Sequence, residues 1–263
     1  MTKQDMLGRE PLMESIKTAS EFVAALGAYE GSETVFNPWR DEDERYDVAG
    51  AAPIRRSQLE AYLTPRLGHC PYVVVAEAIG YQGGRFTGIA ITCERMLLGH
   101  HKTIAPHMIL PMKSDSLFAY DAPGAGNADL MGQRTSRKDS EYIEKATQRS
   151  MGFNEPTDTV VWNAILENGL SPYEVLLWNI FPFHPHKKDV PLSNRTPVPA
   201  ELDAGWAFTE ALLRLNGNAR VLAVGQKAAD TLSHYGVTAT ALRHPANGGA
   251  NLYREQFKAA IRL

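Results

Sequence analysis

Three residues at the ends of apolar stretches carry side chains that could do chemistry together. Glu77 is the next-to-last residue of the run YVVVAEA, Asn179 lies in VLLWNIF, and His244 lies in ALRHPANGG. A buried carboxylate at a strand end lowers stability unless it is solvated, paired or used in a site. An amide can read the edge of a flat heterocycle, and an imidazole can stabilise a leaving group. These residue types therefore indicate a site that binds a planar ring.

Four apolar stretches predict the strands that would position these side chains. They cover residues 72–78, 175–181, 220–225 and 238–244. Apolar residues at helical spacing fill the intervals at 157–170, 199–217 and 226–236. This alternation predicts an α/β fold with a parallel sheet and helices on both faces. Ligands of such sheets bind outside the carboxyl ends of the strands, where the three polar residues are expected to meet.

Length and composition favour one domain over residues 1–263. The chain is 44% hydrophobic and 22% charged, which suits a globular protein with a full core. Two helical patterns, at 11–26 and 55–67, predict an N-terminal helical segment over 1–70. Residues 100–156 are polar and show little periodicity, so a long excursion on the carboxyl side of the sheet is expected there.

Charge and cysteine content exclude several classes of protein. The net charge of −3 argues against a general binder of polyanions, so nucleic-acid binding has to be argued from the site. Cys70 and Cys93 are too few for a four-cysteine cluster, and the histidines of FHPH have no acidic or thiol companions at metal-site spacing, so neither metal nor cofactor is expected. The chain shows neither a long apolar run nor a cleavable leader, which favours a cytoplasmic protein without membrane contact.

Four motifs, in order, resemble those of the uracil-DNA glycosylase superfamily. They are AEAIGYQGGRFTGIAITCERMLLG, WNIFPFHPH, LSNRTP and LRHPANGG, and the similarity runs from about Tyr72 to the C-terminus. The nearest resemblance is to compact bacterial members. It implies a three-layer α/β/α sandwich around a four-stranded parallel sheet. It also implies a monomeric DNA-repair hydrolase that flips deoxyuridine out of DNA, cleaves its N-glycosidic bond and releases free uracil.

The resemblance assigns roles to two of the opening residues. Asn179 matches the residue that reads the pyrimidine edge, where an amide suits O4 and N3–H of uracil and rejects cytosine. His244 matches the histidine that donates to O2 of the departing base. The family motif usually continues with serine, whereas this chain has Ala246. Backbone amides of the following turn, formed by Asn247, Gly248 and Gly249, are expected to hold a DNA phosphate instead.

The glycine-rich motif departs from the family in its water-handling position. In well-known branches this position is Asp or Asn, and here it is Ala78. Glu77 is the candidate catalytic carboxylate beside the sugar, and two roles stay open for it: orienting water, or organising the loop. The sequence around it looks like the Gly-Glu-Ala-Pro-Gly form of iron–sulfur relatives, whose cluster this chain has too few cysteines to bind.

Base contacts are expected from four further residues of the same motif. Ile91 falls where the family has the aromatic that stacks on uracil, so weaker uracil binding is expected. Phe86 is a candidate replacement, or else a core residue. Gly80 or Tyr81 lies near the position that excludes the thymine methyl group in some members.

Basic residues of two polar stretches are candidates for phosphate contacts. They are Arg134, Arg137, Lys138 and Arg195. Each could equally lie in a solvated surface loop. The departures at Ala78 and Ile91 keep a second hypothesis open, a low-turnover protein that binds uracil-containing or damaged DNA. A small-nucleotide enzyme is a third, although the glycine loop lacks a phosphate-binding lysine.

Overall fold

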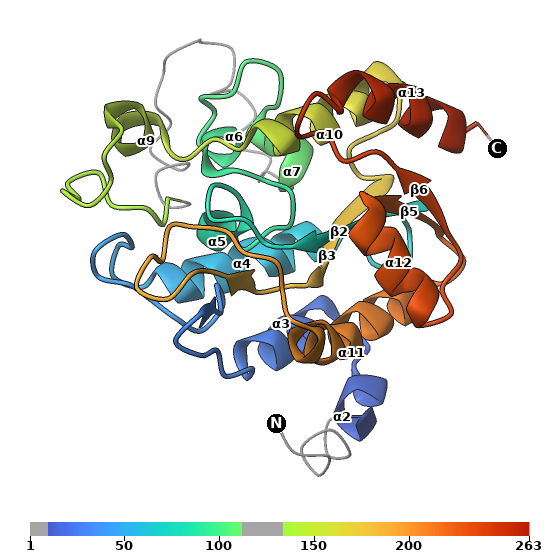
Figure 1. Cartoon of the computed structure of the whole chain (residues 1–263), viewed down its shortest axis with the longest axis horizontal. Coiled ribbons are helices and arrows are strands. Elements are labelled where there is room, and N and C mark those ends of the chain that lie inside the picture. The colour runs from blue at the N-terminus through green and yellow to red at the C-terminus, as the bar shows by residue number, and fades with distance from the viewer. Residues whose placement is uncertain (1–9, 112–133, 263) are drawn as a thin grey trace.

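A computed structural model of the protein describes residues 10–111 and 134–262 and shows a parallel four-stranded sheet. The strands lie in the order β3-β2-β5-β6 (Figure 1). Their bounds are β2 (Tyr72–Ala78), β3 (Val175–Phe181), β5 (Arg220–Val224) and β6 (Ala239–Leu242). The predicted strands at 72–78 and 175–181 are confirmed to the residue, and the other two are shorter than predicted. The α/β fold class is confirmed.

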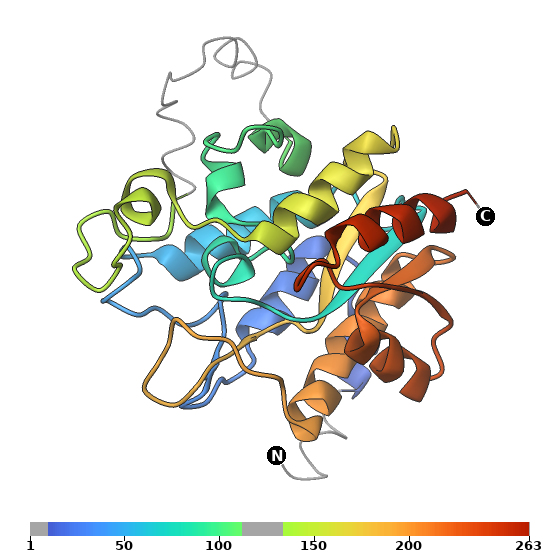
Figure 2. The ribbon, with the colours of Figure 1, turned by 45° about the horizontal axis from the view of Figure 1, so that its top comes forward.

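Helices cover both faces of this sheet and give three layers (Figure 2). On one face α10 (Pro156–Glu167) and α13 (Ala250–Ala260) pack against each other. On the other, α11 (Pro199–Leu215) packs on β3, and α12 (Gln226–His234) packs on β5 and β6. Because both faces are covered, every residue of β3 is buried, which explains its unbroken apolar sequence VLLWNIF.

The N-terminal part of the chain adds helices and a small second sheet. It contains α2 (Glu10–Ser15), α3 (Ala19–Gly27) and α4 (Ala51–Leu63). Thr18 caps α3 in a reciprocal pair with Glu21, an arrangement that satisfies free amides at a helix start. Strand β1 (Val35–Phe36) pairs antiparallel with β4 (His184–Pro185), a pairing that the sequence did not predict.

Short helices build the loops between β2 and α10. They are α5 (Gly84–Thr87), α6 (Glu94–Leu97), α7 (Pro106–Ile109) and α9 (Ala146–Met151). The Glu94 carboxylate, buried at the start of α6, accepts backbone N–H groups from Thr135 and Ser136, both at 2.9 Å. Part of the predicted excursion, residues 112–133, lies outside the described residues. Within the two described ranges, none of the helices combines the length and apolarity needed to span a membrane.

Candidate active site

A cavity of about 160 Å³ lies at the carboxyl ends of the parallel strands. It is lined by Ala76, Ala78, Gly80, Gly83, Gly84, Ile91, Glu155, Thr157, Asp158, Asn179, Asn194 and His244. Five of the residues singled out from the sequence are therefore brought to one cavity: Ala78, Gly80, Ile91, Asn179 and His244. The amide from β3 and the imidazole beyond β6 face the same space, as the sheet topology implies.

Asn179 presents an unused acceptor to this cavity. It is paired in register with Ala76 of β2, and it is only 2% exposed. Its side-chain oxygen Oδ1 has no hydrogen-bond partner in the described structure. A buried amide oxygen without a partner costs about 1–3 kcal/mol, so a ligand with an N–H group would find a matched site here.

His244 presents a hydrogen-bond donor. The backbone N–H of Ala246 donates to its Nδ1 at 3.1 Å, which makes Nδ1 the acceptor and leaves the proton of the neutral ring on Nε2. Burial, helped by the neighbouring charge of Arg243, lowers the pKa of the imidazole from its usual value. The ring is thus held neutral at pH 7 with an N–H to offer to a carbonyl oxygen.

Two glycines fix the position of this histidine. Gly225, the N-cap residue just before α12, has φ of 85° and ψ of 160°, a conformation almost restricted to glycine. A Cβ atom at Gly225 would lie 3.3 Å from Cβ of His244. At Gly249, which precedes α13, a Cβ atom would lie 2.0 Å from the His244 carbonyl oxygen. The backbone can approach the histidine from both sides only because neither position carries a side chain.

Two carboxyl groups that the sequence did not single out also line the cavity. Both belong to the start of α10: Glu155 at its N-cap and Asp158 in its first turn. Asp158 is 3% exposed, and its Oδ2 has no hydrogen-bond partner in the described structure. Burial, followed by the adjacent Glu155 carboxylate, raises the pKa of Asp158 well above its usual value. Burial also raises the pKa of Glu155.

Glu77 turns away from the cavity. Successive side chains of a strand point to opposite faces, so Ala76 and Ala78 line the cavity while Glu77 faces α12. There its Oε1 lies 3.6 Å from Nζ of Lys227. Burial raises the pKa of Glu77, and the positive charge of Lys227 opposes that effect.

Ile91 forms an aliphatic wall of the cavity in an unusual conformation. Its φ of 51° is left-handed, which is rare for a β-branched residue and costs about 1–3 kcal/mol. The indole N–H of Trp162, from α10, donates to the Ile91 carbonyl oxygen at 3.0 Å and holds it there. Strain of this kind concentrates at functional sites.

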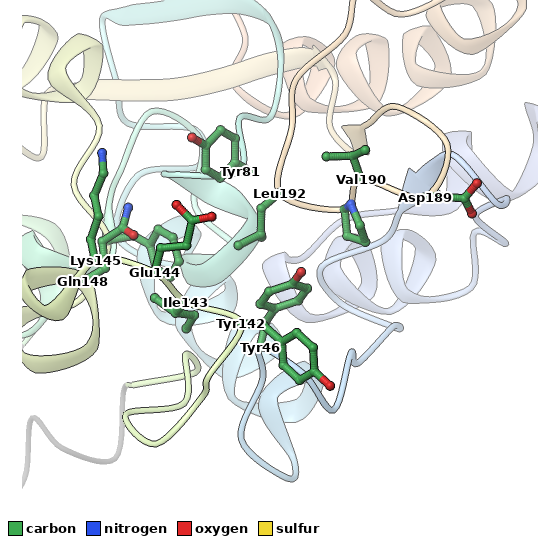
Figure 3. A pocket seen from close by; sticks show the side chains of 12 residues that line it. Tyr46, Tyr81, Tyr142, Ile143, Glu144, Lys145, Gln148, Asp189, Val190 and Leu192 are labelled. Atoms are coloured by element: carbon green, nitrogen blue, oxygen red, sulfur yellow. The ribbon is translucent and has the colours of Figure 1, made fainter.

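Phe86 and Tyr81 lie outside the cavity. Phe86 is fully buried and stacks on Phe153, with ring centroids 4.1 Å apart. Tyr81 lines a second cavity of about 290 Å³, which also receives Tyr46, Tyr142 and Leu192 (Figure 3). Because Gly80 lines the first cavity and Tyr81 the second, the two are neighbours along this loop.

The candidate phosphate-binding residues differ in their availability. The guanidinium of Arg134 is buried and donates to the carbonyl oxygens of residues 136, 148, 149 and 150. Arg195 forms an ion pair of 2.6 Å with Glu201. Arg137 is more exposed, although it pairs with Asp139. Asn247 and Gly248 are exposed at the start of α13.

Comparisons with known proteins identify the fold. No known protein-family profile matches the chain, and no curated protein matches it in sequence. Among solved structures it is similar to the crystal structure of wild-type SMUG2 from Pedobacter heparinus, a member of the uracil-DNA glycosylase superfamily. The TM-score is 0.54 at 15% identity, covering 94% of this chain and 98% of that one. The chain has a uracil-DNA glycosylase fold.

Within this glycosylase fold, the polar cavity residues that the sequence did not single out share one feature. Glu155, Thr157, Asp158 and Asn194 come from segments that face the strand ends rather than from the strands themselves. Asn194 lies in the quoted motif LSNRTP, and its Oδ1 accepts the backbone N–H of Tyr81 at 3.0 Å. It thereby ties that motif to the glycine loop. Among the described residues of the glycosylase fold, no group of three or more His, Cys, Asp or Glu is placed to hold a metal ion.

Proposed function

We propose that this protein is a monofunctional DNA glycosylase that hydrolyses the N-glycosidic bond of deoxyuridine in DNA, leaving an abasic site and free uracil. The observation that carries this is the pairing, in one cavity, of the unpartnered Asn179 oxygen with the neutral His244 ring. Uracil offers an N–H to the first and a carbonyl oxygen to the second. The fold shared with SMUG2 supports the same conclusion.

In this proposal the two groups divide the work between recognition and leaving-group stabilisation. Asn179 accepts from N3–H of the extruded base and donates to O4, a pattern that cytosine reverses. His244 donates from Nε2 to O2 as negative charge develops on the departing base. An aimed donor of this kind contributes about 3 kcal/mol to transition-state stabilisation.

Attack at the sugar is assigned to water. The described lining of the cavity includes no lysine, so there is no amine to form an imine with the sugar. Glu77 pairs with Lys227, which supports its organising the glycine loop rather than orienting that water. With Ile91 as the cavity wall, the base gains less than the ~1–3 kcal/mol that stacking on an aromatic ring supplies.

DNA contacts are assigned to the exposed turn before α13. Asn247 and Gly248 are exposed just before α13, where phosphate is favoured by free N–H groups and the helix dipole. Gly249 was also expected to contact DNA, but it is buried and its N–H donates to the Ala246 carbonyl oxygen at 3.1 Å. Arg137 adds a positive charge, and its exposed ion pair with Asp139 can give way to an ion pair with a DNA phosphate. Arg134 and Arg195 are engaged within the protein and support loops. We propose that the protein acts as a cytoplasmic monomer on such DNA.

Release of free uracil from labelled oligonucleotides tests this function. Single- and double-stranded substrates carrying uracil, hypoxanthine, xanthine or thymine would be compared under single-turnover conditions. We expect uracil release without strand cleavage until the abasic site is treated with base. Tight binding of uracil-containing DNA with no release would replace this proposal with the low-turnover binding function.

Asn179→Asp tests the edge-reading role. The substitution exchanges the donating NH₂ for an acceptor, so the exocyclic amine of cytosine becomes acceptable. We expect uracil release to slow and cytosine release from the same sequence to become measurable. Asn179→Leu is the matched control, since it removes both functions and should release neither base. A variant with wild-type uracil rates and no cytosine release would contradict the assignment.

A further inference from the structure

The Asp158 carboxyl lies in the more buried part of the cavity. It is 3% exposed, and Asn179 is 2% exposed, whereas His244 and Glu155 are partly exposed. The two most buried polar side chains of the cavity therefore come from α10 and β3. Under the proposed function, an extruded nucleotide enters base first, so these two groups meet the deepest edge of the base, and His244 meets its O2 nearer the sugar.

The glycine loop makes room for this carboxyl. A Cβ atom at Gly83 would lie only 2.8 Å from Oδ2 of Asp158. That oxygen is buried and has no hydrogen-bond partner in the described structure, and Asp158 is one of the residues that line the cavity. A buried polar atom without a partner is costly to keep, so its retention beside a ligand-sized space points to a partner on the ligand.

The surroundings of Asp158 favour its protonated form. Glu155, on the same helix, adds a negative charge, and burial raises the pKa of both carboxyls. Cys93, which precedes α6, has its pKa raised to about 12 by burial and is a neutral thiol. His244, across the cavity, has a lowered pKa and is a neutral imidazole. No cation among the described lining residues offsets these effects.

A protonated carboxyl is a donor to carbonyl oxygens, and an ionised one is an acceptor that repels them. A base carbonyl has two lone pairs, so it can accept from Asn179 and from a second donor together. An amino group at the same position would meet a donor instead. Protonation of this carboxyl thus decides whether the cavity prefers an oxo base or an amino base.

We propose that Asp158 is a second specificity-determining residue, whose neutral carboxyl donates a hydrogen bond to a carbonyl oxygen of the extruded base. This inference rests on the proposed glycosylase function and names the chemical class of its substrates, which are the oxo bases formed when amino bases are deaminated. It does not assign Asp158 the task of activating water, for which a carboxylate would be needed.

The rate of uracil release against pH separates the two roles. For the wild type we expect single-turnover release to fall as pH rises through the raised pKa of the carboxyl pair. Asp158→Asn keeps a donor, so at pH 7 its rate should stay within about tenfold of the wild type, and the decline at high pH should disappear. Asp158→Leu has no donor, so below that pKa it should be roughly a hundredfold or more slower than the wild type, and its rate should not show the decline at high pH.

Other outcomes would overturn the inference. If Asp158 activated water, the wild-type rate would rise with pH, and Asp158→Asn would be as slow as Asp158→Leu. An unchanged rate for Asp158→Leu would remove the residue from the site altogether. Folding of each variant is checked by thermal unfolding followed by circular dichroism.

A failure of the proposed function is distinguishable from a failure of this inference. If the wild type releases no uracil from any oligonucleotide at any pH, the function fails. The inference is then tested by the affinity of the three proteins for free uracil, measured by calorimetry over a series of pH values. We expect wild-type affinity to fall as pH rises through the raised pKa of Asp158 and the affinity of Asp158→Asn to stay constant. Equal behaviour of the three proteins would overturn the role of Asp158.

Discussion

His244 shows how one backbone hydrogen bond can set the chemistry of a side chain. Because Nδ1 accepts from Ala246, Nε2 carries the proton that would stabilise the departing base. We expect His244→Ala to lower the single-turnover rate of uracil release roughly a hundredfold or more while changing DNA affinity only a few-fold. His234, on α12 and outside the cavity, provides the control substitution His234→Ala. Equal rates for the two variants would remove His244 from the mechanism.

Asp158 also predicts how stability depends on pH. Burial and Glu155 raise its pKa in the folded protein, so between the unfolded and folded pKa values the folded state binds the extra proton. Its contribution to stability is therefore full below the unfolded pKa, about 3.9, and is lost as pH rises through the folded pKa. The slope approaches about −1.4 kcal/mol per pH unit within that window.

Urea unfolding at a series of pH values measures this effect. The free energy of unfolding of the wild type, minus that of Asp158→Asn, should fall as pH rises above about 4. Taking this difference cancels the titration of the groups that the two proteins share. Glu155 is the exception, because its pKa is raised less in Asp158→Asn, where its neighbour carries no charge. A difference that stays flat with pH would mean that the Asp158 carboxyl is as well solvated in the fold as in the unfolded chain.

At the scale of elements, the junction between β5 and α12 holds His244 in place. Gly225 combines a positive φ with a close approach to the histidine, so Gly225→Ala should both strain the backbone and displace the ring. Gly236, just beyond the other end of α12, has φ of 77°, and no atom of the described residues lies within 4 Å of the place that a Cβ would take there. Gly236→Ala is thus a control for backbone strain alone.

Comparing these two glycine variants isolates the contact with His244. We expect both to unfold at lower urea concentrations, each losing about 1 kcal/mol or more from the left-handed backbone. Only Gly225→Ala should also slow uracil release under conditions in which the variants are fully folded. If both variants kept the wild-type rate, Gly225 would matter only for stability.

The elements also explain what the sequence could and could not predict. Strands β2 and β3 were predicted to the residue because a strand buried on both faces is a continuous apolar run. The meeting of Asn179 with His244 followed from parallel strand ends. Asp158 carried no such signal, since an acidic residue in the first turn of a helix is favoured at any helix start. Nothing local to it indicates that α10 begins against Gly83 of a distant loop.

Ile91 illustrates a second limit. Its left-handed backbone depends on the Trp162 indole, which reaches it from another element. Composition and periodicity reflect only residues that are close in sequence. They therefore cannot predict a backbone conformation at Ile91 that is stabilised by a residue of α10. The same limit applies to Glu77. Its position near a strand end indicated a site residue, but side chains alternate between the two faces of β2, so Glu77 points away from the cavity and pairs with Lys227.

At the scale of the whole molecule, hydrogen bonds and buried ion pairs join the N-terminal segment to the glycine loop. Trp39 donates from its indole N–H to the Gly88 carbonyl oxygen at 3.2 Å. The buried Asp47 carboxylate lies 3.2 Å from the guanidinium of Arg55 in α4 and 2.8 Å from that of Arg85 in α5. The part of the chain with the weakest motif similarity is therefore joined directly to the part that lines the cavity.

This buried ion cluster gives the last prediction. Asp47→Asn would leave Arg55 and Arg85 as two buried cations without their shared anion, and breaking a buried ion pair from one side costs about 3–5 kcal/mol. Arg85→Met removes one cation and leaves a single Asp47–Arg55 pair, so it should destabilise less. Asp139→Asn breaks the exposed pair with Arg137 and should leave the urea midpoint close to that of the wild type. If Asp47→Asn unfolded no earlier than Asp139→Asn, the cluster would not be what joins the N-terminal segment to the loop.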